Sequence, residues 1–583
     1  MITQQAVTHI PLSQYAFANS ERSLTIRLRC AAGELERCIL WYGDRVQPGD
    51  PIRFTPLTME QTAHELDFDY YEATFDSPYT RVCYYFELAG GGELLYLYAD
   101  IFSTQIPSER SEFYQYPFIR REEIATVPTW LKHAVVYNIF PDSFASGRRS
   151  IRGACSETVW ENGLTLKSRL GGSIRGITEN LDYIAELGFN CIYFNPIFTA
   201  GEYHRYDTLD YFHISPSLGT DDDFRALVEQ AHSLGLRVVI DGVFNHCSWY
   251  FFAFDDVVCN GESSRYKNWF YDLTFPVVRP PEGTAPGYAS FAYEPKMPKL
   301  NTSNPEVRDY FMQVCAHWIR EYHVDGWRLD VANEVDREFW RTFKHTARAI
   351  DPDSVMIGEI WENAESWLRG DMFDSAMNYD LRKHCRDFFA RGAIDAAQFS
   401  ARITQMLHRY PTGIVQGQLN LLDSHDVSRF LSLCGGDVQR LRLAEVFLFT
   451  APGAPCVFYG DELGMTGVSE PDYRSAMPWD VPAEDLRPLF RSLIALRNKN
   501  DTLALGTFRS VWAKGSLYIY RREWESKTVA VALNAGPAEA ALPVLNTPDS
   551  APILCWMYRD GVLGPFGCAV WSEGKQKQPA PIF

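Results

Sequence analysis

The stretch Gly326-Trp327-Arg328-Leu329-Asp330 decides how the central part of this 583-residue chain folds. It is a short, mostly apolar run that ends in a carboxylate, and an amphipathic stretch follows it. Parallel strands and the helices that cover them have this appearance in a sequence. The same rhythm recurs between about residues 130 and 460, where we expect eight strands, at 135–140, 191–194, 238–241, 326–329, 355–358, 376–378, 418–422 and 456–459. Eight such strands predict a (β/α)8 barrel of the TIM type.

The flanking sequence predicts a multidomain protein. Residues 1–125 alternate apolar and polar residues in short runs between turns, as in 24–30 and 81–86, which predicts an N-terminal β-sandwich. Its sheet signals end near Ile106-Pro107, and a polar connector continues to about Trp130. The barrel takes 126–246 and 301–502, and alternation after Asp501 predicts a C-terminal antiparallel β domain over 503–583. The insertion at 247–300, rich in aromatic residues and proline, is too long for an ordinary loop and predicts a subdomain over the barrel mouth.

Composition and charge exclude several classes of function. The formal net charge of −19 would repel a phosphate backbone, and no dense run of basic residues opposes it, so no nucleic acid partner is expected. The first twenty residues lack the basic start and apolar core of a secretory signal, and no apolar stretch is long enough to span a membrane. Thirteen cysteines without a Cys-x-x-Cys pair argue against a disulfide framework and a structural zinc site. We therefore expect a cytoplasmic protein.

Several of the expected strands end in polar residues on one rim of the barrel. Active sites of (β/α)8 barrels lie at the carboxyl ends of the strands, so these residues are candidates for chemistry. A single carboxylate in such a place is usually structural, but four strands that end this way on one rim favour a site. The strand ends are 241–246 (DGVFNH), Asp330, Glu359 and 423–426 (DSHD).

Asp330 and Glu359 suit glycoside cleavage with retention of configuration. This reaction needs an ionised nucleophile and a protonated acid about 5 to 5.5 Å apart. Arg328 lies two residues before Asp330, hence on the same face of the strand, and we expect its guanidinium to keep the nucleophile ionised. The apolar neighbours of Glu359 are expected to raise its pKa, and Asp426 beside His425 would stabilise an oxocarbenium-like transition state. The reaction requires no metal.

Four segments together resemble the signature regions of the α-amylase family. They are 241–246 (DGVFNH), 326–334 (GWRLDVANE), 358–361 (GEIW) and 424–426 (SHD). Residues 297–301 (MPKLN), the VANE ending and the extra N-terminal domain are further similar to the cyclomaltodextrinase, neopullulanase and maltogenic amylase branch. The resemblance covers essentially the whole chain.

The resemblance implies a role for individual residues. It makes Asp330 the nucleophile, Glu359 the acid/base and Asp426 the stabiliser, in agreement with the strand ends. Tyr206 is implied as a stacking platform for a sugar ring, and Arg474 as a clamp on the terminal sugar, although Glu470 stands where the family usually has aspartate. The other implied sugar-binding residues are His204, Asp207, Asp241, Asn245, His246, Arg328 and His425. On the leaving-group side the candidates are Phe291, Asn333, Glu334, Trp361 and Tyr379, whose aromatic members would otherwise be ordinary packing.

One departure from the family concerns calcium. Relatives bind the ion through Asn or Asp side chains after a Phe-Ala-x-Gly segment and through the Asp of a Gly-Gly-Asp. Here Arg148 and Arg149 follow 144–147 (FASG), and Ser173 replaces that aspartate. Ca2+ prefers several anionic oxygens. We therefore expect no calcium at this place, and no cofactor.

The expected function is hydrolysis of α-1,4 bonds in cyclodextrins and maltooligosaccharides through a covalent glycosyl-enzyme, with pullulan and starch as further candidates and transglycosylation as a side reaction. Alternatives within the enzyme class are a neopullulanase-type enzyme, a transglycosylase and a debranching enzyme for α-1,6 bonds. A non-catalytic glucan-binding protein or an accessory protein is disfavoured because all three carboxylates are present. The resemblance also implies a homodimer, in which the N-terminal domain either mediates dimer contacts or binds glucan.

Overall fold

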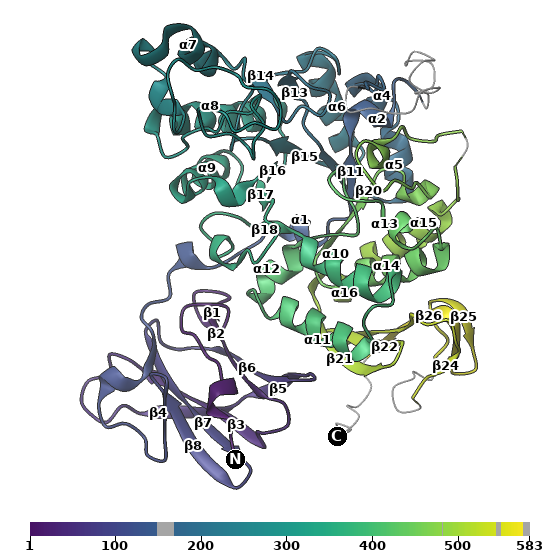
Figure 1. The fold of residues 1–583 in the computed structure, drawn as a ribbon. Coiled ribbons are helices and arrows are strands. Elements are labelled where there is room, and N and C mark those ends of the chain that lie inside the picture. The colour runs from purple at the N-terminus through teal and green to yellow at the C-terminus, as the bar shows by residue number, and fades with distance from the viewer. Residues whose placement is uncertain (149–167, 481, 544–549, 575–583) are drawn as a thin grey trace.

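The centre of the molecule is a closed barrel of eight parallel strands (Figure 1) in a computed structural model that describes residues 1–148, 168–480, 482–543 and 550–574. Each strand pairs with the next along the chain, and the last pairs with the first. The strands are β11 (Val136–Ile139), β12 (Cys191–Phe194), β15 (Arg237–Gly242), β16 (Gly326–Leu329), β17 (Val355–Gly358), β18 (Ser375–Asn378), β19 (Leu419–Leu421) and β20 (Ala454–Phe458). The prediction of eight barrel strands is confirmed, with each end within two residues.

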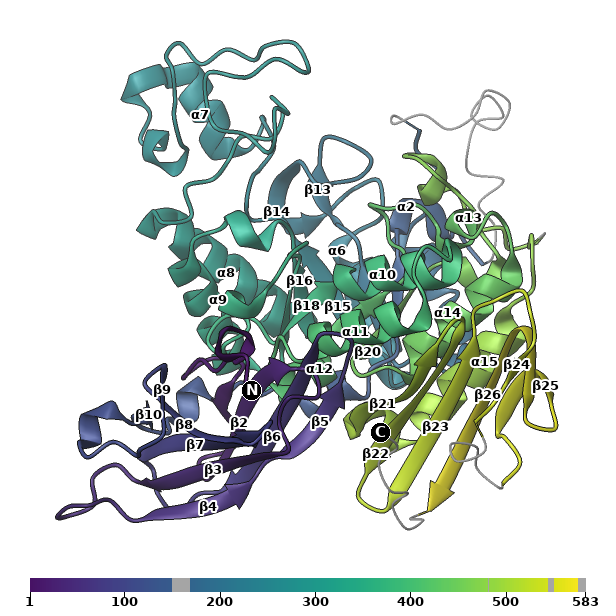
Figure 2. The same cartoon turned by 60° about the horizontal axis from the view of Figure 1, so that its bottom comes forward.

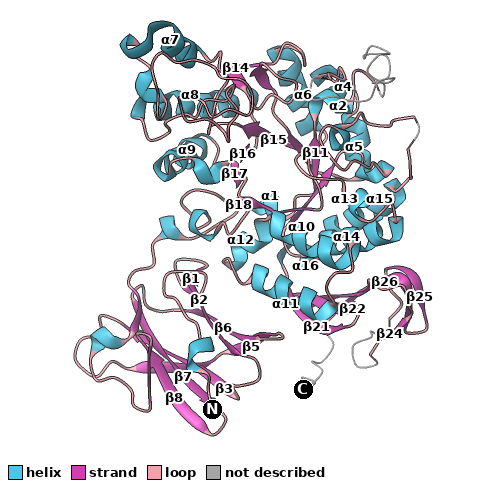
Figure 3. Cartoon of the chain, in the orientation of Figure 1, coloured by secondary structure: helices cyan, strands magenta, loops and turns pink. Residues whose placement is uncertain are grey.

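Helices surround this barrel on its outside (Figure 3). Their starts follow local sequence signals: Thr220 and Asp223 form a capping box at α6, and Asp336 accepts the amide hydrogens of Glu338 and Phe339 at α9. The larger helices are α5 (Leu181–Leu187), α6 (Asp221–Ser233), α8 (Pro305–Tyr322), α9 (Arg337–Ile350), α10 (Tyr379–Cys385), α11 (Ala396–Leu407), α12 (Thr412–Gly417), α14 (Val438–Thr450) and α15 (Arg487–Asn498).

Strand β16 shows why the decisive stretch fits its place. A Cβ atom on Gly326 would lie 2.4 Å from a Val355 methyl and 2.7 Å from the Val355 carbonyl oxygen, so only glycine lets β16 approach β17 this closely. Trp327 is buried between the barrel and the aromatic rings of Phe244 and Phe343. Alternation along the strand then turns Arg328 to the opposite side, where the carboxylates are.

The chain between β15 and α8 forms a separate lobe around α7 (Phe252–Asn260), which projects from the rest of the molecule (Figure 2). Its core is aromatic: Phe254 packs against Trp249, Phe270 and Tyr288. The two ends of the lobe lie side by side where they join the barrel, and there the amide of Leu300 donates to the carbonyl of Asn245 at 3.0 Å.

The N-terminal part is a sandwich of two antiparallel sheets, in the orders β1-β2-β6-β5 and β4-β3-β7-β8-β9. A short strand, β10 (Tyr114–Tyr116), also pairs with β7. The prediction that sheet signals end near Ile106-Pro107 was therefore wrong, because three residues with two buried tyrosines give too short a pattern to recognise. The strands are β1 (Ala16–Ala18), β2 (Ser23–Ala31), β3 (Arg37–Asp44), β4 (Phe54–Thr58), β5 (Glu60–His64), β6 (Phe68–Asp76), β7 (Val82–Gly90), β8 (Glu93–Tyr98) and β9 (Ile101–Ser103).

The C-terminal part is an antiparallel sheet in the order β21-β22-β23-β26-β24, with β25 paired to β26. It packs beside α11, α14 and the last helix of the barrel region, α16 (Asp501–Leu505) (Figure 2). The predicted fold class, a barrel flanked by two β domains, is thus confirmed. The strands are β21 (Thr507–Lys514), β22 (Leu517–Trp524), β23 (Lys527–Asn534), β24 (Ala540–Ala541), β25 (Leu554–Arg559) and β26 (Val562–Gly574).

The three parts meet at the loop between β5 and β6. The carboxylate of Glu65 in this loop accepts hydrogen bonds from the hydroxyls of Ser400, at 3.2 Å, and Thr404, both on α11. Ser400 in turn lies 2.7 Å from the hydroxyl of Ser510 on β21. Nearby, the buried Arg27 of β2 donates to the carbonyl oxygen of Tyr410 at 2.9 Å. Polar contacts therefore join the sandwich to the barrel region, and Ser400 of that region joins it in turn to the C-terminal part.

Candidate active site

One buried guanidinium holds together carboxylates from three neighbouring strands. Nη1 of Arg328, on β16, lies 2.9 Å from both carboxylate oxygens of Asp241, at the end of β15, and 2.8 Å from Oδ1 of Asp330. Nη2 of Arg328 lies 2.7 Å from Oε1 of Glu359, which follows β17. The two carboxylates predicted to act as nucleophile and acid thus lie within the span of one guanidinium group.

Arg328 contacts three carboxylates, and its effect on the pKa of Asp330 is smaller than the effect of burial. Burial raises the pKa of Asp330 well above its usual range, and the charges of Glu359 and Asp241 add to this, while Arg328 opposes it. Arg328 lowers the pKa of Asp330, but burial has the larger effect, so the expectation that Arg328 keeps Asp330 ionised stays a prediction. In a cluster of acids around one cation, protonation is a property of the coupled group as a whole.

The environment of Glu359 is polar. Besides Arg328, its Oε1 accepts from the indole nitrogen of Trp361 at 3.2 Å and the hydroxyl of Tyr379 at 3.5 Å, and its Oε2 accepts from the Val331 amide at 3.1 Å. The apolar setting predicted from its sequence neighbours was wrong. Those neighbours, such as Ile360, are buried in the core, whereas the carboxylate points to the donors across the barrel mouth.

Val331 directly follows Asp330 and has an unusual backbone. Its φ is +44°, in the left-handed region that a β-branched residue avoids, at a cost on the order of 1 to 3 kcal/mol. The conformation directs the Val331 amide toward Glu359, so this strain orients a donor between the two central carboxylates. Sequence reasoning missed Val331, and a valine carries no signal for a positive φ.

Asp426 sits between a histidine and an arginine. Its Oδ2 lies 2.9 Å from Nε2 of His425, and its Oδ1 lies 3.3 Å from Nη2 of Arg474. Burial alone would raise the pKa of Asp426, but His425 and Arg474 outweigh burial and lower the pKa. The pKa of Asp426 therefore shifts in the opposite direction to that of Asp330. The side-chain amide of Asn195, which sequence reasoning also missed, lies 2.8 Å from Nδ1 of His425 and orients the ring.

Arg474 is itself clamped. It donates from Nε to the carbonyl oxygen of His425 at 2.7 Å and from Nη1 to the hydroxyl of Tyr203 at 3.0 Å, and it pairs with Glu470. The Tyr203 hydroxyl also donates to Glu470 at 3.2 Å. The longer side chain of Glu470 therefore still reaches the arginine in this chain.

A pocket of about 500 Å3 opens above these groups and brings most of the predicted residues together. Met297 and Val331 join them, without having been predicted. The predicted residues that line the pocket are His204, Tyr206, His246, Phe291, Asp330, Asn333, Glu334, Glu359, Trp361, Asp426, Glu470 and Arg474.

The remaining predicted residues lie outside this lining. Asp241, Asn245, Arg328, Tyr379 and His425 are nearly or fully buried and contact the lining residues from behind. Asp207 instead accepts the amide hydrogens of Gly201 and Glu202, both at 3.0 Å, and so fixes the loop that carries Tyr206. The ring of Tyr206 is stacked on that of His425, with 5.4 Å between centroids.

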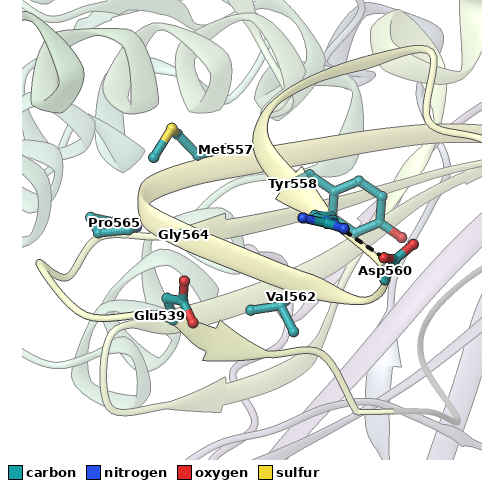
Figure 4. Close-up of a pocket in the computed structure, with 8 residues that line it drawn as sticks. Glu539, Met557, Tyr558, Asp560, Val562, Gly564 and Pro565 are labelled. Carbon is teal, nitrogen blue, oxygen red and sulfur yellow. Dashed lines mark hydrogen bonds and ion pairs between the residues drawn. The ribbon is translucent and has the colours of Figure 1, made fainter.

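A second cavity, of about 520 Å3, lies in the C-terminal sheet, away from the barrel (Figure 4). Tyr558, Arg559, Asp560 and Glu539 are among the residues that line it. It contains none of the residues predicted for the site.

The place predicted to lack calcium is only partly within the described residues, because Arg149 lies outside them. Ser173 caps α4 (Ile174–Thr178) by accepting the Gly176 amide at 3.0 Å, and the Arg148 guanidinium lies 3.1 Å from Asp182. Over the described part of the chain, no group of three or more His, Cys, Asp or Glu side chains is arranged to hold a metal ion. Within the same residues, no helix combines the length and apolarity needed to cross a bilayer.

Comparisons with known proteins show the family to which this sequence and fold are similar. Residues 138–503 match the alpha amylase catalytic domain, and residues 1–120 match the alpha amylase N-terminal ig-like domain. The chain is 39% identical over 548 residues to a cyclomaltodextrinase of Geobacillus thermopakistaniensis (93% of this chain, 92% of the relative). It is 40% identical over 554 residues to neopullulanase 2 of Thermoactinomyces vulgaris (94% and 93%). A solved cyclomaltodextrinase structure, 34% identical, superposes with a TM-score of 0.88 over 98% of this chain and 100% of that one.

Proposed function

Because this chain belongs to the α-amylase family of glycoside hydrolases, in its cyclomaltodextrinase, neopullulanase and maltogenic amylase branch, we propose that it is a retaining enzyme that cleaves α-1,4-glucosidic bonds of cyclodextrins and short maltooligosaccharides. The observation that carries the proposal is the Arg328 guanidinium, which brings Asp330 and Glu359 together at the floor of one pocket. Retention requires two carboxylates about 5 to 5.5 Å apart, and two groups that contact one guanidinium can have this separation.

The first step needs Asp330 ionised and Glu359 protonated. Asp330, whose charge lies beside Arg328, attacks the anomeric carbon as the glycosidic bond breaks. Glu359 gives its proton to the leaving oxygen. In the second step Glu359, now ionised and facing the Trp361, Tyr379 and Val331 donors, takes a proton from water, which releases the sugar from Asp330.

Asp426 stays ionised through both steps. Its negative charge, held by His425 and Arg474, lies in the same pocket as Asp330 and stabilises the positive charge that develops on the sugar ring. Arg474, Glu470 and Tyr203 form one interlinked wall on this side of the pocket. Such a wall favours short chains, whose ends lie close to the bond that is cut.

Transglycosylation is the second activity that a specific observation favours. Trp361, with 42% of its surface exposed, stacks on Tyr379 at 3.8 Å between ring centroids and donates to Glu359. An exposed indole beside the acid/base is a platform on which a second sugar can stack and take the place of water.

Three further proposals concern the state of the protein. We propose that the place around Ser173 and Arg148 binds no calcium, since one side chain is committed to a helix cap and the other is a cation. A cytoplasmic location agrees with the twelve described cysteines, all of which are free thiols. A homodimer through the N-terminal sandwich agrees with the exposed apolar side chains there, among them Leu66, Leu94, Ile101 and Phe118. Light scattering of the purified protein tests the dimer.

The deciding experiment compares initial rates on γ-cyclodextrin, pullulan and soluble starch, with chromatography of the products and Glu359→Gln as the blank. We expect γ-cyclodextrin to be cut faster than starch, and the signal to disappear in the variant. Equal rates on starch or pullulan would replace the cyclodextrin preference by a neopullulanase-type activity. Absence of cleavage on all three would reject the proposal.

A further inference from the structure

Lys299 stands in the 297–301 segment but does not line the pocket. Its ammonium group contacts two side chains that belong to the site: it donates to Oδ1 of Asn245, and to Oε2 of Glu334 at 2.8 Å. The backbone holds the lysine in place, because its amide donates to the Ala289 carbonyl at 2.9 Å and it pairs with His246 as an antiparallel bridge. The proposed reaction assigns no role to this partly buried cation.

The first consequence concerns the orientation of the Asn245 amide. An ammonium group only donates hydrogen bonds, so the Asn245 atom that faces it must be the oxygen. The amide nitrogen then points the other way, where it lies 3.2 Å from Nδ1 of His246. This nitrogen can only donate as well. Nδ1 of His246 is therefore the acceptor, and a neutral ring must carry its hydrogen on Nε2.

The second consequence concerns the free side of the ring. His246 is 1% exposed, lines the pocket and stacks on Phe291 with 4.9 Å between centroids. Its Nε2 is buried, and no atom of the described residues, the nearby Tyr206 carbonyl included, forms a hydrogen bond of normal geometry with it. Burial lowers the pKa of His246 to about 3, the Lys299 charge adds to this, and the Tyr206 carbonyl opposes it, so the ring is neutral during catalysis. A buried donor without a partner is costly unless a ligand supplies the acceptor.

We propose that Lys299 is a positioning residue that, through Asn245, fixes His246 as a neutral Nε2–H donor to an oxygen atom of the bound sugar. The inference rests on the proposed function, because it takes the ligand of this pocket to be a glucan. The same ammonium group pairs with Glu334, so one lysine helps to hold two of the side chains that line the pocket.

The test uses the full chain and two readouts. In protein labelled with 15N-histidine, the ring-nitrogen shifts and their couplings to ring protons show which nitrogen carries the hydrogen, and the loss of a signal in His246→Gln assigns it. We expect the Nε2–H form in the wild type and in Lys299→Arg, which still donates to Asn245. In Lys299→Met the amide is free to flip, and we expect the Nδ1–H form to become populated.

The kinetic readout is kcat/KM on γ-cyclodextrin. We expect a loss of about 10- to 100-fold in Lys299→Met, which is the usual effect of losing one oriented hydrogen bond at a site, with substantial recovery in Lys299→Arg. Lys296→Met is the matched control, because Lys296 lies in the same segment but pairs with Glu202 and Glu282, and we expect it to retain wild-type rates. Melting curves verify that each variant is folded.

An Nδ1–H form in the wild type, or an unchanged tautomer and rate in Lys299→Met, would overturn the inference. The tautomer is measured without substrate. If the wild type cleaves no α-glucan, the proposed function fails, and the assignment of the ring hydrogen is still decided by the spectrum.

Discussion

At the scale of single residues, Asp330 carries the most specific prediction. Asp330→Asn retains the shape of the side chain and its place beside Arg328, but a neutral amide cannot attack an anomeric carbon. We expect kcat on γ-cyclodextrin to fall by about three orders of magnitude or more, with an unchanged or slightly higher melting temperature, since the buried acid is replaced by a neutral group. Asp336→Asn, which retains the cap of α9, is the control and should remain active. Near-normal rates for Asp330→Asn would reject the nucleophile.

The raised pKa of Asp330 predicts the acid side of the pH profile. Activity requires Asp330 to be ionised, so kcat/KM falls as pH decreases through the pKa of the free enzyme. Burial places this pKa well above the usual value of about 3.9 for an aspartate. We therefore expect the acid limb to lie above that value, and a pH series of initial rates measures it. An acid limb at or below the usual aspartate range would show that Arg328 outweighs burial after all.

The residues at the place where relatives bind calcium predict insensitivity to chelators. Ser173 is used as a helix cap and Arg148 contributes positive charge beside Asp182. Dialysis against a chelator should change neither the γ-cyclodextrin rate nor the melting temperature, and readdition of Ca2+ should have no effect. A fall in either quantity that Ca2+ restores would mean that other oxygens, including those of residues outside the described part, bind the ion.

At the scale of elements, Arg429 links the loop after β19 to the loop after β20. It is fully buried, donates to the carbonyl of Tyr459 at 2.7 Å and pairs with Asp461 at 2.9 Å, while its amide donates to Gly467. The first loop carries Asp426 and the second carries Glu470 and Arg474. Arg429 therefore fixes the loop that carries Asp426 relative to the loop that carries Glu470 and Arg474.

Arg429→Met leaves Asp461 buried without its cation, which typically costs about 3 to 5 kcal/mol of folding free energy. We expect a lower melting temperature and a fall in kcat/KM on γ-cyclodextrin, because Asp426 and Arg474 lose their common support. Urea unfolding and initial rates measure the two effects. Arg487→Met, which removes a partly exposed pair with Asp485, is the control and should cost at most about 1 kcal/mol. Equal stability of the two variants would contradict the linking role.

The barrel strands were predictable because apolar runs and the polar residues that end them are local features. The same rule located Asp330, Glu359 and Asp426. It failed for what surrounds them: the donors that reach Glu359 include Val331, with its positive φ, and Tyr379, twenty residues along the chain. Contacts of this kind depend on how strands and loops are brought together, and a sequence pattern of period two contains no such information. The three-residue pattern of β10 was likewise too short to be recognised as a strand.

At the scale of the whole molecule, Glu65 responds to pH where three parts of the protein meet. Burial raises its pKa to about 7, although hydrogen bonds from Thr404 and Ser400 oppose this. The folded protein then holds this proton more tightly than the unfolded chain, so its contribution to stability is full below about pH 4.5 and is lost as pH rises through about 7.

Glu65→Gln should therefore leave stability near pH 5 almost unchanged and increase it at pH 8 relative to the wild type, by on the order of 1 kcal/mol after allowance for solvent screening. Melting temperatures of both proteins between pH 5 and 8 measure this. Glu60→Gln, on the exposed side of the same hairpin, is the control. A wild-type curve that runs parallel to that of Glu65→Gln would show that this carboxyl does not titrate in the range.

The pairing of β11 with β20 has a consequence for how the protein is made. Val136 lies beside Cys456, so 456 − 136 = 320 further residues must leave the ribosome before the first barrel strand finds its last neighbour. At about 5 to 20 residues per second this takes roughly 15 to 65 seconds. The N-terminal sandwich, whose last strand ends at Tyr116, is complete before that wait begins. During these seconds the edge of β11 that will pair with β20 is unpaired and can pair with strands of other nascent chains. Slow expression at low temperature, or added chaperone capacity, should therefore increase the soluble yield of the barrel more than that of the sandwich.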